Sequence, residues 1–437
     1  MDIRELINHS PMSARQWSIV AIALFLNALD GYDIVAMAFG SSAVTEAFEL
    51  SGVQLGWLLT SALIGIGLGS VFLAPYADRF GRTKLITIAL VIDLCGLILT
   101  ALAPNFALLL LFRILTGIGV GGVLVCVTVL VSEFSNLRFR GLAMALYTGG
   151  YGFGAMFCGF VAARLGPVYG WQAIFWAGAA LTVVGLGLTI FFVPESAEFL
   201  ASRGRMDEVS AIAKRIGVQG SASFSPRPVE KATWKELVSP AFLRTSIQLW
   251  LAFSLIMFAY YFTSQWTPKL LQEEGLTAQQ GILGGIMLSF GGTIGALVYG
   301  VLTTRIDARR LLIRFGLGSA GVLVGFIVSS SMPAVMFILG IGVGLMLNAC
   351  IAGLYTVTPE AYPSVLRTTG TGAAIGIARM GSTLAPILAG YLLDAGWTPL
   401  GLYTLAGAAA LIAAVSLIGL RAHGATLEET APAPVAA

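Results

Sequence analysis

The sequence predicts an all-α integral membrane protein with twelve transmembrane helices in two related six-helix bundles. Three observations lead to this prediction: the composition, the spacing of the apolar segments and an internal repeat. Of the 437 residues, 57% are hydrophobic and only 11% are charged, whereas a soluble domain has about 25% charged residues. The apolar segments are long enough to cross a hydrocarbon core of about 30 Å as helices, which excludes a barrel of short strands.

Twelve apolar segments, separated by charged residues or turn signals, give the predicted helices. They cover residues 17–41, 54–77, 84–103, 106–133, 140–163, 171–193, 244–268, 279–303, 310–330, 333–356, 368–393 and 398–420. The one long connection runs from Pro194 to Phe242, and we expect short amphipathic helices in it near Ser196–Ser202 and Met206–Ile216. The predicted organisation is an N-terminal bundle (1–193), a cytoplasmic linker (194–243), a C-terminal bundle (244–420) and a cytoplasmic tail (421–437).

Positive charges lie on one side of the predicted spans. With a cytoplasmic N-terminus, the outer loops hold only Arg164 and Lys269. The inner loops hold the long connection and Arg79, Arg82, Lys84, Arg138, Arg140, Arg305, Arg309, Arg310 and Arg367. Because this bias sets orientation, we expect a multi-pass protein of the inner (plasma) membrane with both termini in the cytoplasm. The first apolar segment is too long for a signal-peptide core, so we expect it to be retained.

The composition also excludes several classes of function. A net charge of +3 gives no reason to expect nucleic-acid binding. The two histidines, His9 and His423, lie in the terminal tails, and the four cysteines lie in apolar segments without paired spacing. We therefore expect buried, unpaired cysteines, no metal site and no disulfide framework. No catalytic constellation is recognisable, so we predict no enzyme activity and no cofactor, in a monomer surrounded by lipid.

The two halves of the chain are related by sequence. Residues 74–84 align without gaps to residues 300–310, an offset of 226, and Glu133 and Arg140 align with Glu360 and Arg367, an offset of 227. Parallel repeats of this kind occur in major facilitator transporters, whose substrates bind near the midplane between the halves. The intramembrane charges do not repeat: Asp30 aligns with Ile256, Asp33 with Ala259, Asp93 with Ser319, Arg113 with Leu339 and Arg379 with Gly152. Such one-sided charges are the better candidates for substrate and ion chemistry.

Two carboxylates, Asp30 and Asp33, lie deep in the first predicted helix. Their spacing of three residues places them on one helix face, and an acid at this depth costs a few kcal/mol or more. Removal from water and mutual repulsion both favour a protonated carboxyl group, so we predict a proton site here that also contributes to substrate binding. The alternative is that each acid only accepts a hydrogen bond that orders the helix. Gly31 between them would allow close helix approach or a local break.

Three further charged residues lie within predicted spans. Arg379, near the midplane of the eleventh helix, has a guanidinium suited to a carboxylate. We predict that it anchors the substrate; alternatively it is a structural partner for an acid such as Asp30 or Asp33. Asp93 could pair with Arg113, but a third helix often faces lipid or the bundle edge, so we favour a structural role for Asp93 over a functional one.

The chain resembles the major facilitator superfamily over nearly its whole length. Three motifs support this: Asp78-Arg-Phe-Gly-Arg-Thr-Lys84 between helices 2 and 3, Arg113 with Gly117 and Gly119 in helix 4, and Pro194-Glu-Ser196 after helix 6. Ala74 departs from the pattern, which usually has Gly there. The segments Leu29-Asp-Gly-Tyr-Asp33 and Leu366-Arg-Thr-Thr-Gly-Thr-Gly372, followed by Ala378-Arg-Met-Gly381, resemble the aromatic acid:proton symporters. Relatives that carry sugars, nicotinate or other organic anions share parts of these segments.

The resemblance implies roles for several of these residues. Arg113 is similar to an arginine implicated in proton transfer; the alternative is a structural ion pair. A set of loop charges would form ion pairs and helix-end contacts that hold an inner, cytoplasmic gate closed: Asp78, Arg79, Arg82, Glu133, Arg140, Glu360 and Arg367. Positive-inside topology alone would explain the arginines, but it does not explain the aligned glutamates.

Aromatic and polar residues at membrane depth would suit a planar, apolar acid. As substrate-binding residues beside Arg379, Asp30 and Asp33 we predict Tyr147, Tyr151, Gln265, Trp266 and Asn348. Further aromatic and polar residues at the same membrane depth are Asn27, Trp57, Tyr260, Tyr261, Phe290 and Tyr355. The alternative for each is packing or an interfacial belt, and Trp266 with Gln265 could equally anchor the outer end of helix 7.

Together these features predict a proton-coupled symporter that imports an organic anion, an aromatic carboxylate of the benzoate type, by alternating access. Two alternatives remain. A sugar or other neutral-solute porter would need polar hydrogen-bonding pairs at midplane and would leave Arg379 unexplained. A membrane receptor or sensor for aromatic acids would bind without accumulating them, and the short outer loops argue against it.

Overall fold

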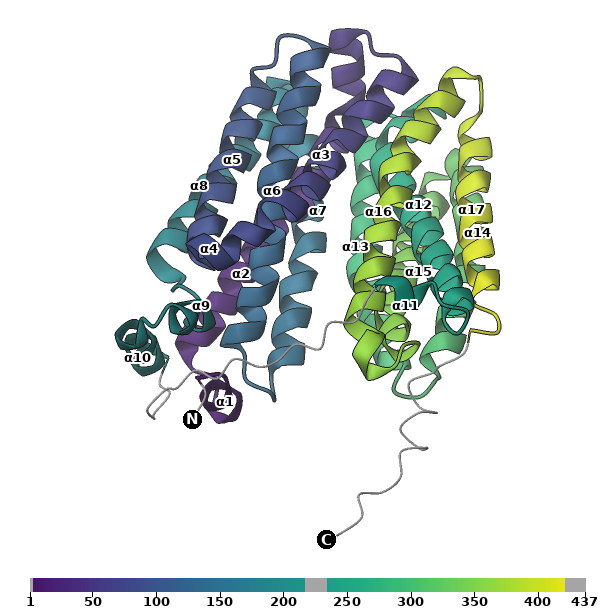
Figure 1. The fold of residues 1–437 in the computed structure, drawn as a ribbon. Helices are drawn as coiled ribbons and strands as arrows, with labels where there is room; N and C mark the ends of the chain where they lie inside the picture. The colour runs from purple at the N-terminus through teal and green to yellow at the C-terminus, as the bar shows by residue number, and fades with distance from the viewer. Residues whose placement is uncertain (1–2, 217–233, 421–437) are drawn as a thin grey trace. The chain divides into compact units, whose positions relative to one another are not determined.

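The computed structural model describes residues 3–216 and 234–420, except for a few side chains that include that of Asp78. Within these ranges every regular element is a helix (Figure 1), which confirms the predicted all-α class. The chain divides into two compact units, Met1–Arg227 and Pro228–Ala437. Each unit is considered separately below.

Among the residues that the structure describes, the first unit contains six long helices and five short elements. In order these are α1 (Ile3–His9), α2 (Ala14–Phe48), α3 (Gly52–Phe72), η1 (Ala74–Tyr76), α4 (Ala77–Phe80), α5 (Arg82–Ala101), α6 (Phe106–Phe134), α7 (Arg140–Tyr169), α8 (Gln172–Phe192), α9 (Ala197–Ser202) and α10 (Met206–Arg215). The short helices α9 and α10 lie where the sequence predicts two amphipathic helices.

Within its described part, residues 234–420, the second unit contains six further long helices. Its elements are α11 (Trp234–Leu237), α12 (Leu243–Glu273), α13 (Ala278–Leu302), α14 (Ala308–Val328), η2 (Ser329–Ser331), α15 (Pro333–Glu360), α16 (Ser364–Asp394) and α17 (Pro399–Ser416). Each of the twelve predicted spans therefore corresponds to one long helix.

Among the described residues, eleven of these long helices are apolar enough to cross a membrane, and α7, rich in glycine and tyrosine, is not among them. Two boundaries differ clearly from the prediction. The span predicted at 54–77 ends at Phe72 and is followed by the short 3-10 helix η1, because Pro75 has no backbone N–H with which to continue the α-helical hydrogen bonds. Helix α2 runs beyond the predicted residue 41 to Phe48 and begins at a capping box formed by Ser13 and Gln16.

The same helix pairs pack in both units. In the first, α2 packs along α7, α3 along α6, and α5 against both α6 and α8. In the second, α12 packs along α16, α13 along α15, and α14 against both α15 and α17. The predicted repeat is thus a repeat of helix packing.

Glycines at repeat-related positions set the tightest of these crossings. A Cβ atom built on Gly154 of α7 would lie 1.7 Å from the Ala28 carbonyl oxygen, and one built on Gly381 of α16 would lie 2.0 Å from that of Ser254. These positions are related by the predicted offsets, since 154 plus 227 is 381 and 28 plus 226 is 254. Only glycine permits such an approach of two backbones.

The glycine contacts also correct one aligned pair. Gly117 of α6 and Gly344 of α15 meet the Ala62 and Leu288 carbonyl oxygens in the same way, so the offset between α6 and α15 is 227. The counterpart of Arg113 is therefore Gly340 rather than Leu339. The counterpart is uncharged in either case, so the asymmetry of this charge stands.

Candidate functional site

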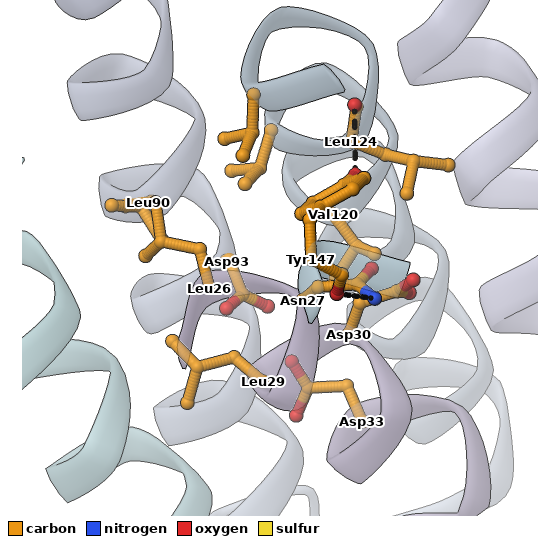
Figure 2. Close-up of a pocket in the computed structure, with 12 residues that line it drawn as sticks. Leu26, Asn27, Leu29, Asp30, Asp33, Leu90, Asp93, Val120, Leu124 and Tyr147 are labelled. Carbon is orange, nitrogen blue, oxygen red and sulfur yellow. Dashed lines mark hydrogen bonds between the residues drawn. The ribbon is translucent and has the colours of Figure 1, made fainter. Parts of the chain in front are cut away.

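Three aspartates face one small pocket inside the first unit (Figure 2). Asp30 and Asp33 come from α2 and Asp93 from α5. Their exposed fractions are 9%, 1% and 2%. The rest of the lining is mainly apolar: Leu26, Leu29, Leu90, Val120, Val123, Leu124 and Val127, with Asn27 and Tyr147.

The pocket is far too small for an aromatic ring. Its cavity volume is about 10 Å³, close to the least space that holds one water molecule, whereas pockets for small organic ligands measure roughly 300–1,000 Å³. The arrangement suits protons and water, with any larger substrate held elsewhere.

Helix α2 is held rigidly at this depth. A Cβ atom on Gly31 would lie 2.0 Å from the Tyr151 carbonyl oxygen of α7. Asn27 Nδ2 donates hydrogen bonds to the carbonyl oxygens of Tyr147 (2.8 Å) and Thr148 (3.2 Å). Of the two readings of Gly31, close helix approach is therefore confirmed and a local break is wrong, since α2 continues through this point.

Asp93 is the residue of the site whose position differs most from the prediction. The sequence suggested a third helix facing lipid or the bundle edge, but Asp93 is buried, and its carboxyl group lies within hydrogen-bonding reach of that of Asp33. Thr182 Oγ1 of α8 donates to Asp93 Oδ2 over 3.3 Å. Gly119 of α6 allows the approach, because its Cβ would lie 2.8 Å from Asp93 Cβ. Gly119 was the feature of the sequence that could have indicated this burial, because a glycine of this kind marks a helix face that packs closely against another helix.

Arg113 is the buried cation of this cluster, with an exposed fraction of 1%. Its Nη2 donates to the backbone carbonyl oxygen of Asp33 over 2.7 Å, and its guanidinium lies 5.4 Å from the centre of the Phe175 ring. It interacts electrostatically with the carboxyl groups of Asp33 and Asp93. Its Nε and Nη1 have no hydrogen-bond partner among the residues that the structure describes.

A second polar cluster joins α5, α6 and the start of α9. Arg82 forms an ion pair with Glu133, and the Ser196 hydroxyl lies between them, accepting from Arg82 Nη1 (2.9 Å) and donating to Glu133 Oε2 (2.6 Å). Glu195 Oε1 accepts from the backbone N–H groups of Arg82 (2.7 Å) and Thr83 (3.0 Å) at the start of α5. The sequence identified the Pro194-Glu-Ser196 motif without revealing that it caps α5.

The other predicted gate residues make less extensive contacts. The Arg79 carbonyl oxygen accepts from Arg203 Nη2 over 2.8 Å, and Arg140 Nη2 donates to Asn8 Oδ1 and to the Ser135 carbonyl oxygen. In the second unit Glu360 and Arg367 are exposed, and Arg367 Nε donates to the Pro359 carbonyl oxygen over 3.1 Å. The side chain of Asp78 lies outside the described residues. Control of a gate by this set stays a prediction.

Arg379 of α16 lies in an aromatic environment within the second unit. It is half-buried and interacts electrostatically with the Tyr355 phenol of α15. The Tyr355 ring in turn meets that of Phe253 of α12 edge-on, with ring centres 5.5 Å apart. A cation beside an aromatic wall is a fitting surface for a planar aromatic acid.

The remaining predicted substrate residues differ in accessibility. Gln265 and Trp266 are fully buried, and Trp266 Nε1 donates to the Pro386 carbonyl oxygen over 3.1 Å. Asn348 is half-buried against Gly292. Tyr147 lines the aspartate pocket and Tyr151 is half-buried on the same helix. Their contact with substrate stays a prediction, and the burial of Trp266 favours its structural alternative.

Comparison with known proteins identifies the family. The sequence matches the family model described as the Major Facilitator Superfamily over residues 20–350 and again over residues 278–436. The chain belongs to the major facilitator superfamily. It is accordingly a multi-pass membrane transporter of small organic molecules and not an enzyme.

The similar proteins of known role are bacterial transporters. A gallate transporter of Pseudomonas putida is 29% identical over 430 residues, covering 96% of this chain and 94% of that protein. The 4-hydroxybenzoate transporter PcaK of Acinetobacter baylyi is 30% identical and covers 91% and 89%, and the niacin transporter NiaP of the same organism is 30% identical and covers 98% and 99%. This similarity bears out the resemblance to aromatic acid transporters.

Among solved structures, the inward open xylose transporter XylE from E. coli resembles this chain with a TM-score of 0.74. The sequences are 19% identical, and the match covers 95% of this chain and 98% of that one. At this identity the likeness shows the shared fold alone.

Proposed function

We propose that this protein is a proton-coupled symporter that imports aromatic carboxylates of the benzoate type by alternating access. The observation that carries the proposal is the set of three buried aspartates around a pocket of about 10 Å³, with the buried Arg113 bonded to the backbone of Asp33 beside them. The names of the similar proteins, which are transporters of gallate, 4-hydroxybenzoate and niacin, support the substrate class.

The charge balance of the cluster favours protons. With Asp30, Asp33 and Asp93 all ionised, the single cation of Arg113 would leave a net charge of −2 inside the bundle. Such a charge is costly in a low-dielectric interior, and buried groups escape the cost by taking up protons. A site that must be partly protonated, and that is roomy enough for water, can couple transport to the proton gradient.

Arg379 is the proposed anchor for the substrate carboxylate. Its guanidinium can form two parallel hydrogen bonds to a carboxylate, and Tyr355, which packs edge-on against the buried Phe253, supplies aromatic surface beside it. The bundles 1–193 and 244–420 would alternate access to the substrate, with the gate charges controlling the cytoplasmic side. We propose both termini in the cytoplasm and a monomer as the working unit.

The deciding experiment is uptake of labelled 4-hydroxybenzoate into proteoliposomes with pH and voltage gradients imposed separately. We expect accumulation when the outside is acidic, and none with equal pH on both sides and no voltage. A monoanion carried with one proton would respond to the pH gradient alone, whereas a second proton would add a response to voltage of about 2.3 kcal/mol per 100 mV. Uptake that is indifferent to the pH gradient, or uptake of xylose in place of the acid, would refute the proposal.

A further inference from the structure

The carboxyl groups of Asp33 and Asp93 form a pair across two helices. Both are almost completely buried and both line the same pocket. They lie within hydrogen-bonding reach of each other, and Figure 2 shows both directed into the pocket. Asp33 Oδ2 and Asp93 Oδ1 have no hydrogen-bond partner among the described residues.

Two carboxylates at such a separation cannot both stay ionised at low cost. A proton placed between them replaces repulsion by a strong hydrogen bond, so a pair of this kind holds one proton in common. The protonated pair carries a charge of −1, and the neighbouring Arg113 carries +1. The three groups are therefore neutral with one proton and negatively charged without it.

Other groups around the pair do not replace this proton. Asp30, on the same helix as Asp33, adds a further negative charge and lies near Tyr147 of α7. Tyr32 and Cys158 face Asp33, and Thr182 is the α8 neighbour of Asp93. Among the described residues, no group of three acidic, histidine or cysteine side chains is placed to hold a metal ion.

We propose that Asp33 and Asp93 bind the transported proton as a pair, which makes Asp93 a proton-binding residue of the transporter. This inference rests on the proposed symport and names the group that does the coupling. When the proton leaves, one carboxyl O–H bond breaks and one O–H bond forms on a water molecule in the pocket, which carries the proton away. The free Nε and Nη1 of Arg113 can then donate to the ionised pair, which lowers the cost of the empty state.

Asp93→Asn tests the pair directly. The amide donates a hydrogen bond to ionised Asp33, and Arg113 balances that charge, so these three groups become neutral without a proton. We expect exchange of labelled for unlabelled 4-hydroxybenzoate, which needs no net proton movement, to stay within about twofold of wild type. With a pH gradient imposed, the ratio of inside to outside substrate concentration should fall from up to about tenfold per pH unit in wild type to about one in the variant. Glu46→Gln, an exposed acid on α2, is the matched control and should leave both unchanged.

A second measurement does not depend on transport. Infrared difference spectra of the purified protein on raising the pH should show loss of a protonated carboxyl band in wild type and in Glu46→Gln, and no such band from this site in Asp93→Asn. Thr182→Val removes the donor that favours ionised Asp93, so it should tighten proton binding and shift the alkaline limit of uptake to higher pH. This milder variant serves if Asp93→Asn does not fold.

The outcomes separate the two proposals. If wild type accumulates the acid with the pH gradient while Asp93→Asn accumulates it equally well, the pair is wrong and the symport stands. If wild type ignores the pH gradient, the symport is wrong, and the carboxyl band then decides whether the pair exists. In either case, a protonated carboxyl band that is unchanged in Asp93→Asn would refute the proposed pair.

Discussion

The two units share a helical framework and differ in the charged residues that they place within it. In both, the first and fifth long helices cross at a glycine whose Cβ would collide with a backbone carbonyl oxygen, Gly154 in one and Gly381 in the other. The first unit adds three acids and a buried arginine to this framework, while the second adds Arg379 and aromatic rings. The shared residues specify the fold, and the unshared ones are the candidates for transport chemistry.

The aligned residues show how local this difference is. Asp33 and its counterpart Ala259 are both buried, as are Asp93 and Ser319. Ser319 satisfies its hydroxyl within its own helix by donating to the Phe315 carbonyl oxygen over 2.8 Å, whereas Asp93 depends on groups from two other helices. The charges of the first unit therefore arise from a few substitutions at sites that the second unit fills with uncharged side chains.

The largest expected effect is on the shared framework. Gly154→Val and Gly381→Val would each force two helices apart, because even a Cβ would lie 2.0 Å or less from a carbonyl oxygen. Both variants should lose most of their monodisperse folded protein in fluorescence-detected size-exclusion chromatography. Gly149→Val, whose Cβ would have no neighbour within 4 Å, should behave as wild type. A folded Gly381→Val beside an unfolded Gly154→Val would show that the two crossings are not equivalent.

The next effect concerns a charge that the first unit lacks, since Arg379 aligns with Gly152. Arg379→Ala should weaken binding of 4-hydroxybenzoate by roughly 10- to 150-fold, because a hydrogen bond to a charged group contributes about 1.5–3 kcal/mol. Arg379→Lys should recover part of the loss, since lysine keeps the charge but not the planar fork. Isothermal titration calorimetry measures both.

The matched control for this prediction is Arg314→Ala, which removes an exposed arginine of the same unit. It should bind as wild type does. If Arg379→Ala binds the acid with unchanged affinity, Arg379 is not the substrate anchor, and the alternative role as a structural partner for an acid is favoured.

Much of this framework could be predicted from the sequence, for a physical reason. Long apolar segments can cross a membrane only as helices, so all twelve were recognisable, and the repeat followed from gap-free alignment. The depth of Asp30, Asp33 and Arg379 followed from helical rise alone. These features depend on one segment at a time.

The contacts between helices could not be predicted in the same way. Asp93 was given a structural role because no single-helix pattern shows which face meets the bundle interior, and Glu195 was not recognised as the cap of α5 because its partners lie more than 100 residues away. Cys95 was expected to be buried with the other cysteines but is exposed. Each of these depends on the rotation of one helix against its neighbours.

A third prediction compares two aligned glutamates. Glu133 is buried and paired with Arg82 and Ser196, whereas its counterpart Glu360 is exposed. Breaking a buried pair by removing one partner costs about 3–5 kcal/mol, while an exposed charge contributes about 0–1 kcal/mol. Glu133→Gln should therefore lower the thermal midpoint strongly and Glu360→Gln very little, as followed with a thiol-reactive dye. Equal shifts would mean that Glu360 has a partner that matters as much as that of Glu133.

The smallest effect tests the support of α2 beneath the aspartates. Asn27 aligns with Phe253, so one unit joins its first helix to the bundle by hydrogen bonds where the other uses an aromatic ring. Asn27→Ala loses two bonds to carbonyl oxygens that can still accept within α7, and should cost about 1–2 kcal/mol. That corresponds to a fall of roughly a few degrees in the thermal midpoint, while Ser18→Ala, an exposed position of α2, should show none. Asn27 also lines the pocket. Asn27→Ala should therefore reduce uptake driven by the pH gradient more than it reduces substrate exchange. A variant that loses exchange first would place Asn27 at the substrate instead.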